Sequence, residues 1–170
     1  MSEREKLFLL EDDGVFPNHS RWPLIVYLAV FTLGSADSAL EVETLVRKNR
    51  WGSTWRNGIY GFQHYHSRTH ECLAVYRGTA LVQFGGPKGP QLELHVGDVA
   101  VLPAGTAHMN LGSSPDFGVL GAYPRGVRYD LCRGTPEERA MAITAIQEVP
   151  KPETDPVFGF RGGLIDHWRG

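Results

Sequence analysis

Short β-branched and aromatic segments separated by glycine and proline fill the middle of the chain, and this pattern most constrains the fold. Clusters such as Gly85–Pro90 and Pro103–Gly105 mark turns between the segments. Closely spaced short strands with turn signals are typical of an antiparallel sandwich or barrel. We therefore predict an all-β domain with strands at Tyr60–His66, Glu71–Tyr76, Thr79–Phe84, Leu92–Val96, Val99–Leu102, Ala107–Leu111 and Gly118–Tyr123.

Two helices are predicted to flank these strands, at Ser38–Asn49 and Pro136–Gln147. A capping box opens each helix: Ser38 with Glu41, and Thr135 with Glu138. A chain of 170 residues suits a single domain. We expect a barrel core at about 58–129, an N-terminal extension at 1–57, and a C-terminal helix and tail at 130–170.

Residues Leu24–Leu33 form an apolar run that is too short to span a bilayer, since a spanning helix needs about 20 residues. The acidic balance of residues 1–23 also differs from the positive start of a secretory signal. We therefore expect a buried strand that extends a sheet, in a cytoplasmic protein. An exposed apolar edge would pair with another chain, so we expect a homodimer through this region. The alternative is that the strand lies wholly inside its own barrel.

The charge of the chain excludes one class of partner. Seventeen Lys and Arg against 19 Asp and Glu give a net charge of −2, whereas nucleic-acid-binding domains carry a basic patch or stripe. The two cysteines, Cys72 and Cys132, are too few for a disulfide framework and fit a reducing compartment. We expect a small-molecule ligand as partner, and neither a nucleic acid nor a membrane.

Three histidines and a glutamate are predicted to converge inside the barrel. His64 and His66 point to the same face of their strand, because side chains alternate along a strand. Glu71 begins the next strand on the face that carries its larger aliphatic residues, and His108 follows a proline–glycine turn. Three imidazoles and one carboxylate are a suitable ligand set for one divalent transition metal: Fe, Mn, Ni, Zn or Cu.

The spacing of these residues resembles the two sequence motifs of the cupin superfamily. The first motif is matched, with five, one, four and six residues between its members, by Gly58, His64, His66, Glu71 and Gly78. The second motif is matched by Gly97, Pro103, Gly105 and His108. Its usual asparagine falls at Gly112 here, which affects the asparagine's structural role and leaves the ligand set intact.

Further segments resemble the YjlB-like cupins, small bacterial proteins, over nearly the whole chain. These segments are Asn49–Gly52, Trp55–Tyr60, Thr69–Glu71, Gly121–Pro124 and Asp155–Gly159. The resemblance implies a double-stranded β-helix, or jelly-roll, barrel with a metal held by His64, His66, Glu71 and His108. It does not imply one reaction, because cupins include oxygenases, isomerases, storage proteins and sensor domains.

Other side chains near the ligands have two interpretations each. Tyr60, Arg56 and Phe62 are candidate substrate-binding residues, with packing or, for Arg56, a structural ion pair as the alternative. His70 is expected to face away from the site unless the nearby turn re-aims it. A polar cluster at Tyr123–Tyr129 is expected at the mouth of the barrel or at an interface. The histidines outside the motifs are expected at the surface: His19, His95 and His167.

Three functional hypotheses follow from this site. The first is a metal-dependent enzyme, an oxygenase or an isomerase, that acts on a small polar molecule in the barrel. The second is a non-catalytic binding or sensor module in which the metal captures a small molecule. The third is a structural protein that the metal stabilises.

Overall fold

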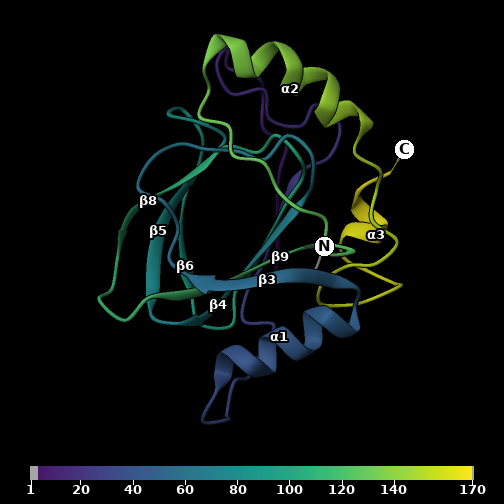
Figure 1. Ribbon diagram of the computed structural model, residues 1–170. Coiled ribbons are helices and arrows are strands. Elements are labelled where there is room, and N and C mark those ends of the chain that lie inside the picture. Colours follow the sequence, from purple (N-terminus) through teal and green to yellow (C-terminus); the bar gives the residue numbers. More distant parts are fainter. Residues whose placement is uncertain (1–3, 170) are drawn as a thin grey trace.

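The computed structural model describes residues 4–169, which form two antiparallel sheets. The larger sheet has the strand order β1-β2-β7-β4-β9-β3 and the smaller sheet has the order β6-β5-β8. The strands are β1 Glu5–Phe8, β2 Leu24–Tyr27, β3 Trp51–Asn57, β4 Glu71–Arg77, β5 Thr79–Phe84, β6 Gln91–His95, β7 Val99–Leu102, β8 His108–Ser113 and β9 Gly118–Pro124. Figure 1 looks into the barrel that the sheets enclose. The predicted all-β jelly-roll fold is confirmed.

The two sheets face each other across an apolar interior. Leu73 and Val75 of β4 point into this interior and pack with Val82 and Phe84 of the smaller sheet. Cys72 and Ala74, which alternate with them along β4, pack on the opposite face of the larger sheet. The alternation that predicted an inward direction for the first residue of β4 therefore holds along this strand.

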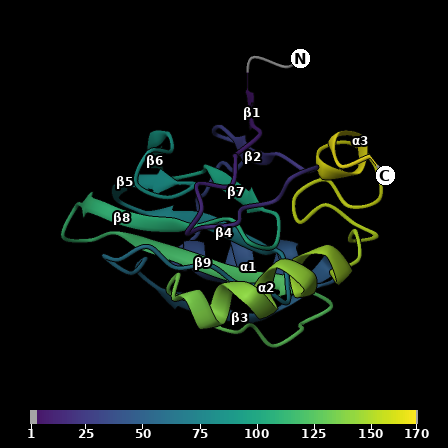
Figure 2. The ribbon, with the colours of Figure 1, turned by 90° about the horizontal axis from the view of Figure 1, so that it is seen from above.

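Helices cover the outside of the barrel: α1 Ser38–Lys48, α2 Pro136–Glu148 and the short α3 Leu164–His167, which the prediction lacks. α1 and α2 lie at opposite sides of the barrel (Figure 1), and Figure 2 views the molecule from the α2 side. Val42 and Val46 of α1 pack on the outer face of the larger sheet with Trp51. Within residues 4–169, no helix is both long enough and apolar enough to cross a membrane.

The helix starts agree with the predicted capping only in part. The capping box of α2 is confirmed, because Thr135 accepts from the Glu138 N–H at 3.3 Å and the Glu138 carboxylate accepts from the Thr135 N–H at 3.0 Å. The predicted box at Ser38 is wrong. Asp37 is the N-cap of α1, and its carboxylate accepts from the Leu40 N–H at 3.0 Å.

The predicted strand at Leu24–Leu33 is shorter than expected, because β2 ends at Tyr27. Ala29 has a φ of 48°, and its N–H donates to the Asp98 carboxylate instead of a neighbouring strand. β2 lies between β1 and β7, so it is not an edge. The alternative of a strand inside its own barrel is therefore correct, and the argument for a homodimer through this strand no longer holds.

The expected strand at Tyr60–His66 is also wrong as a regular element. His64 forms an isolated bridge with His108, and the next residue, Tyr65, pairs with Cys132 instead. A ladder cannot extend when consecutive residues pair with different segments. The backbone groups of His64 and Tyr65 are therefore hydrogen-bonded, but the segment is a loop that crosses the end of the barrel.

Two strands of the larger sheet, β1 and β3, are missing from the prediction. β3 contains Gly52 and Ser53, and its pairing with β9 shifts register between Gly52 and Trp55. Ser53 has a φ of 50°, so this strand is bulged and lacks a clean alternation of apolar residues. β1 has only four residues and lies in a polar segment, so it has no apolar pattern that would predict a strand.

Candidate metal centre

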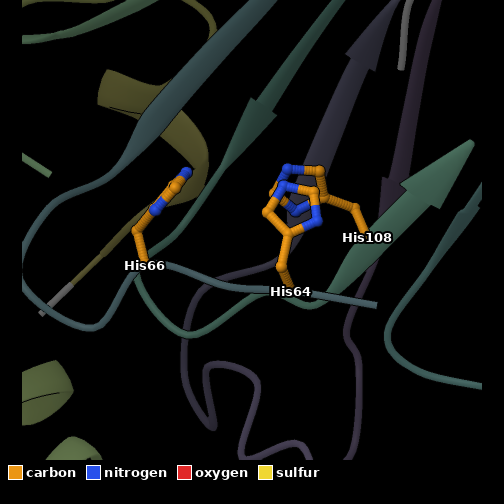
Figure 3. Close-up of side chains that lie close together, drawn as sticks. All are labelled: His64, His66 and His108. Carbon is orange, nitrogen blue, oxygen red and sulfur yellow. The ribbon is translucent and has the colours of Figure 1, made fainter. Parts of the chain in front are cut away.

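Three buried histidines from two segments meet at one end of the barrel. His64 and His66 come from the loop before β4, and His108 is the first residue of β8. One ring nitrogen of each lies within 4.8 Å of those of the other two, a grouping that can hold a metal ion. Figure 3 shows the rings of His64 and His108 against each other, with the His66 ring beside them.

The backbone fixes the tautomer of all three imidazoles. Nδ1 of His64 donates to the Phe62 carbonyl at 3.0 Å, and Nδ1 of His108 donates to the Thr106 carbonyl at 3.0 Å. Nδ1 of His66 donates to the Asp130 carbonyl. Because a carbonyl oxygen can only accept, the proton of each neutral ring is on Nδ1 and Nε2 carries a free lone pair. This arrangement is the one that orients metal-ligating histidines.

Glu71 brings a carboxylate to the same point. Its Oε2 lies 3.2 Å from Nε2 of His108 and 3.4 Å from Nε2 of His66. Oε2 is buried and has no hydrogen-bond donor among the described residues. Oε1 accepts from the Tyr123 hydroxyl at 3.0 Å, and that hydroxyl accepts in turn from Nε1 of Trp55 at 2.7 Å.

Burial and the crowding of acceptors set the electrostatics of the centre. Burial, with a contribution from His108, lowers the pKa of His64 to about 3. Burial opposes ionisation of Glu71, but the adjacent His66 and His108 hold its pKa well below the usual range. The same carboxylate raises the pKa of His66 against the effect of burial. The ionised carboxylate therefore attracts a cation, either a proton shared with an imidazole or a metal ion, and the donor set fits a divalent transition metal.

A cavity of about 270 Å³ opens onto these side chains. Of the predicted substrate-binding residues, Tyr60 and Arg56 line the cavity and Phe62 does not. The Arg56 guanidinium pairs with Glu43 at 2.9 Å and with Asp37 at 3.3 Å, so its main role is the structural ion pair. The remaining lining comes from β3, β4, β9 and the segments next to them: Trp55, Asn57, Gly58, Ile59, Leu73, Tyr123 and Tyr129.

The Trp55–Tyr123–Glu71 chain of hydrogen bonds is the part of the site that the prediction missed. Tyr123 was expected at a mouth or interface, yet it is fully buried beside Glu71, while Tyr129 stacks on it at 4.8 Å between ring centroids. The alternation of side chains along β9 could have predicted that Tyr123 points toward Glu71. Gly121 and Tyr123 are two residues apart and share a face, and the register pairs Gly121 with both Leu73 and Trp55.

The other histidines lie outside the centre. His70 is buried on the far side of the loop, as expected, where Nδ1 accepts from the Ala104 N–H at 2.9 Å and Nε2 donates to the Pro150 carbonyl at 3.1 Å. His95 is exposed as expected and His167 is partly exposed, but the surface position expected for His19 is wrong, because its side chain is only 3% exposed. It stacks on Trp22 with parallel rings 4.6 Å apart.

The sequence pattern of the cupin family matches residues 53–122, a range that holds all four converging side chains: His64, His66, Glu71 and His108. Together with a relative that matches over the full length, this match shows that the chain belongs to the cupin family. It is 41% identical over 168 residues to the uncharacterized protein YjlB of Bacillus subtilis (strain 168), and the match covers 99% of each chain.

Solved cupin structures resemble the chain more distantly. A cupin-like protein from Thermotoga maritima is 18% identical, with a TM-score of 0.35, over 81% of this chain and 82% of its own. The vicilin from Solanum melongena is 25% identical, with a TM-score of 0.34, over 46% of this chain and 24% of its own.

Proposed function

We propose that this centre binds one divalent transition metal through His64, His66, Glu71 and His108, and that the protein is a metal-dependent enzyme. The observation that carries the proposal is the fixed tautomer of the histidines. Three Nε2 lone pairs and the donor-free Oε2 of Glu71 converge on one point. Without a cation these acceptors would repel one another, and the unpaired carboxylate oxygen would remain buried at a cost of about 1–3 kcal/mol or more.

The cavity favours a small polar substrate that reaches the metal itself. One carboxylate and three neutral imidazoles leave a divalent ion with a net charge of about +1, which attracts an anionic or electron-rich group. The volume of about 270 Å³ suits a small molecule. Tyr60 and Tyr129, both about half exposed, stand at the opening beside His64 and His66, respectively, and would contact whatever enters.

Among the described residues that line the cavity, no carboxylate or histidine remains outside the candidate ligand set. Burial raises the pKa of Tyr123 and the neighbouring Glu71 raises it further, so this phenol stays protonated and cannot serve as the base. An isomerase that abstracts a proton from carbon needs a positioned base. The lining therefore favours an oxygenase over an isomerase. A bound metal would supply Lewis-acid polarisation or, for Fe or Mn, one-electron redox chemistry.

Reconstitution with Fe(II), Mn(II) or Ni(II) tests this proposal. Each metal form is screened against small carboxylates, thiols and sugars, with oxygen uptake and product formation monitored. We expect metal-dependent turnover that falls by at least about 100-fold in Glu71→Gln, because the amide lacks the charge that holds the metal. Glu93→Gln is the matched control, since Glu93 is 64% exposed on β6 and should retain full activity.

The other hypotheses are distinct outcomes of the same screen. Saturable binding of a small molecule to the metal form without turnover would support the binding or sensor module and contradict the enzyme hypothesis. Metal-dependent stability, with neither small-molecule binding nor turnover, would support the third hypothesis, a structural protein that the metal stabilises.

The location and assembly of the protein remain proposals. Both cysteines are free and buried, which supports a reducing, cytoplasmic environment. The homodimer stays a prediction, now without β2 as its interface. Light scattering at micromolar concentration tests it, and a monomer mass would contradict it.

A further inference from the structure

A second cavity of about 180 Å³ lies on the far side of the loop that joins His66 to Glu71. Four cationic side chains line it, and they come from four separate segments. They are Arg50 after α1, Arg68 in the joining loop, Arg125 in the turn after β9, and Lys151 in the C-terminal tail.

Only one carboxylate among the lining residues balances these cations. Glu153 pairs with Arg50 at 2.9 Å and also with Arg125. The Arg68 guanidinium has no hydrogen-bond or ion-pair partner in the part of the chain that is described. The Lys151 ammonium donates to the Ile165 carbonyl at 2.8 Å, which leaves its charge unbalanced. The lining thus has a local excess of positive charge in a chain whose net charge is −2.

Two of the arginines occupy backbone conformations that disfavour them. Arg50 has a φ of 65° and Arg125 has a φ of 54°, a region that glycine or asparagine enters at lower cost. The two backbones are joined by a hydrogen bond from the Arg125 N–H to the Arg50 carbonyl at 2.7 Å. Both guanidinium groups reach the same Glu153 carboxylate, which places them on one side of the cavity.

We propose that this cavity binds a phosphate-type oxyanion, either inorganic phosphate or a small phosphate monoester. Guanidinium groups bind tetrahedral oxyanions through paired charge-assisted hydrogen bonds, and several cations from different directions suit a doubly charged ligand. Arg68 is the side chain that is free to close on the ligand. Because Arg68, Thr69 and His70 line the cavity, the ligand would contact the loop that carries His66 and Glu71 at its two ends.

Isothermal titration of the full-length protein at constant ionic strength tests this site, with inorganic phosphate and glycerol 3-phosphate as separate probes and chloride as the reference. We expect saturable binding of at least one probe, weakened about 10-fold or more in Arg68→Gln and in Arg125→Gln. Glu153→Gln should bind at least about 3-fold more tightly, since it removes the one competing carboxylate. The stronger probe identifies whether the free ion or the ester is the ligand.

Arg77→Gln is the matched control, because it makes the same charge change on β4, where the guanidinium Nε donates to the Asp116 carbonyl, away from the cavity lining. Equal weakening in Arg68→Gln and Arg77→Gln would overturn the proposal, and so would the absence of saturable binding by either probe. Weaker binding by Glu153→Gln would also overturn it. Glu71→Gln, which lacks a metal ligand, should keep phosphate binding, so failure at the metal centre is distinguishable from failure here.

Discussion

At the scale of single residues, Tyr123 is the side chain that orients the Glu71 carboxylate. Its hydroxyl donates to Oε1, which leaves Oε2 directed at the histidines. Removing such a supporting hydrogen bond typically costs 10–100-fold in metal affinity. We therefore predict that Tyr123→Phe weakens binding of Co(II) or Zn(II) by about 10–100-fold, measured by competition with a chromogenic chelator.

Tyr65→Phe is the matched control for this prediction. The Tyr65 hydroxyl is also buried, but it has no hydrogen-bond partner among the described residues. Its removal should leave metal affinity unchanged and the free energy of unfolding equal or slightly higher. Equal loss of affinity in both variants would show that Tyr123 acts through general packing.

His19 gives a prediction about pH. Burial, with the charge of Arg21, lowers its pKa from 6.5 to about 4, so the folded state holds the neutral ring. A histidine with a lowered pKa stabilises the fold fully above pH 6.5, and this stability falls as the pH falls toward 4. The expected loss from His19 between pH 7.5 and 5 is about 1–2 kcal/mol, measured by urea unfolding.

His19→Asn separates this contribution from that of the other buried histidines. Nδ1 of His19 accepts from the Trp22 N–H at 3.0 Å, and the asparagine Oδ1 can accept the same bond. The variant should show a shallower loss of stability between pH 7.5 and 5. An unchanged pH dependence would mean that His19 has the same pKa in the folded and unfolded states, which would contradict the prediction.

At the scale of elements, the contact of β3 with β9 supports the candidate metal centre from the wall of its cavity. Trp55 of β3 lies over Gly121 of β9, where an added Cβ would come within 2.1 Å of the indole ring. We predict that Gly121→Ala displaces Trp55, lowers the free energy of unfolding by about 1–3 kcal/mol and weakens metal binding through Tyr123.

Gly112→Ala is the control for this prediction, because an added Cβ at that position meets no atom within 4 Å. It should change the free energy of unfolding by less than about 1 kcal/mol. Thermal and urea unfolding of both variants provide the comparison. Similar destabilisation of the two would show that glycine is needed for backbone freedom and not for space under Trp55.

Elements with a clean local pattern were predictable, and those that depend on distant partners were not. β7 and β5 have the predicted bounds, because their aliphatic runs end in turn residues. The expected strand at Tyr60–His66 fails because its consecutive residues His64 and Tyr65 pair with different segments, at His108 and Cys132. β2 ends early because the turn at Gly97–Asp98 takes the N–H groups of Ala29 and Val30.

At the scale of the whole molecule, the spacing of the histidines in the sequence predicted their convergence without a correct description of the secondary structure. His64, His66 and His108 meet although the first two lie on a loop, since two-residue spacing still aims both side chains into the barrel. The buried state of His19, the direction of Tyr123 and the cationic cavity depend on contacts between segments far apart in the sequence. Such contacts cannot be predicted from the order of the residues alone.

The central claim is that one metal ion is held by the histidines and Glu71. Elemental analysis of protein purified without a chelator tests it most directly, on the wild type, His66→Ala and the exposed-histidine control His95→Ala. We predict about one equivalent of a transition metal per chain in the wild type and the control, and less than about a tenth of that in His66→Ala. No stoichiometric metal in the wild type, or equal metal content in His66→Ala and the wild type, would contradict the account.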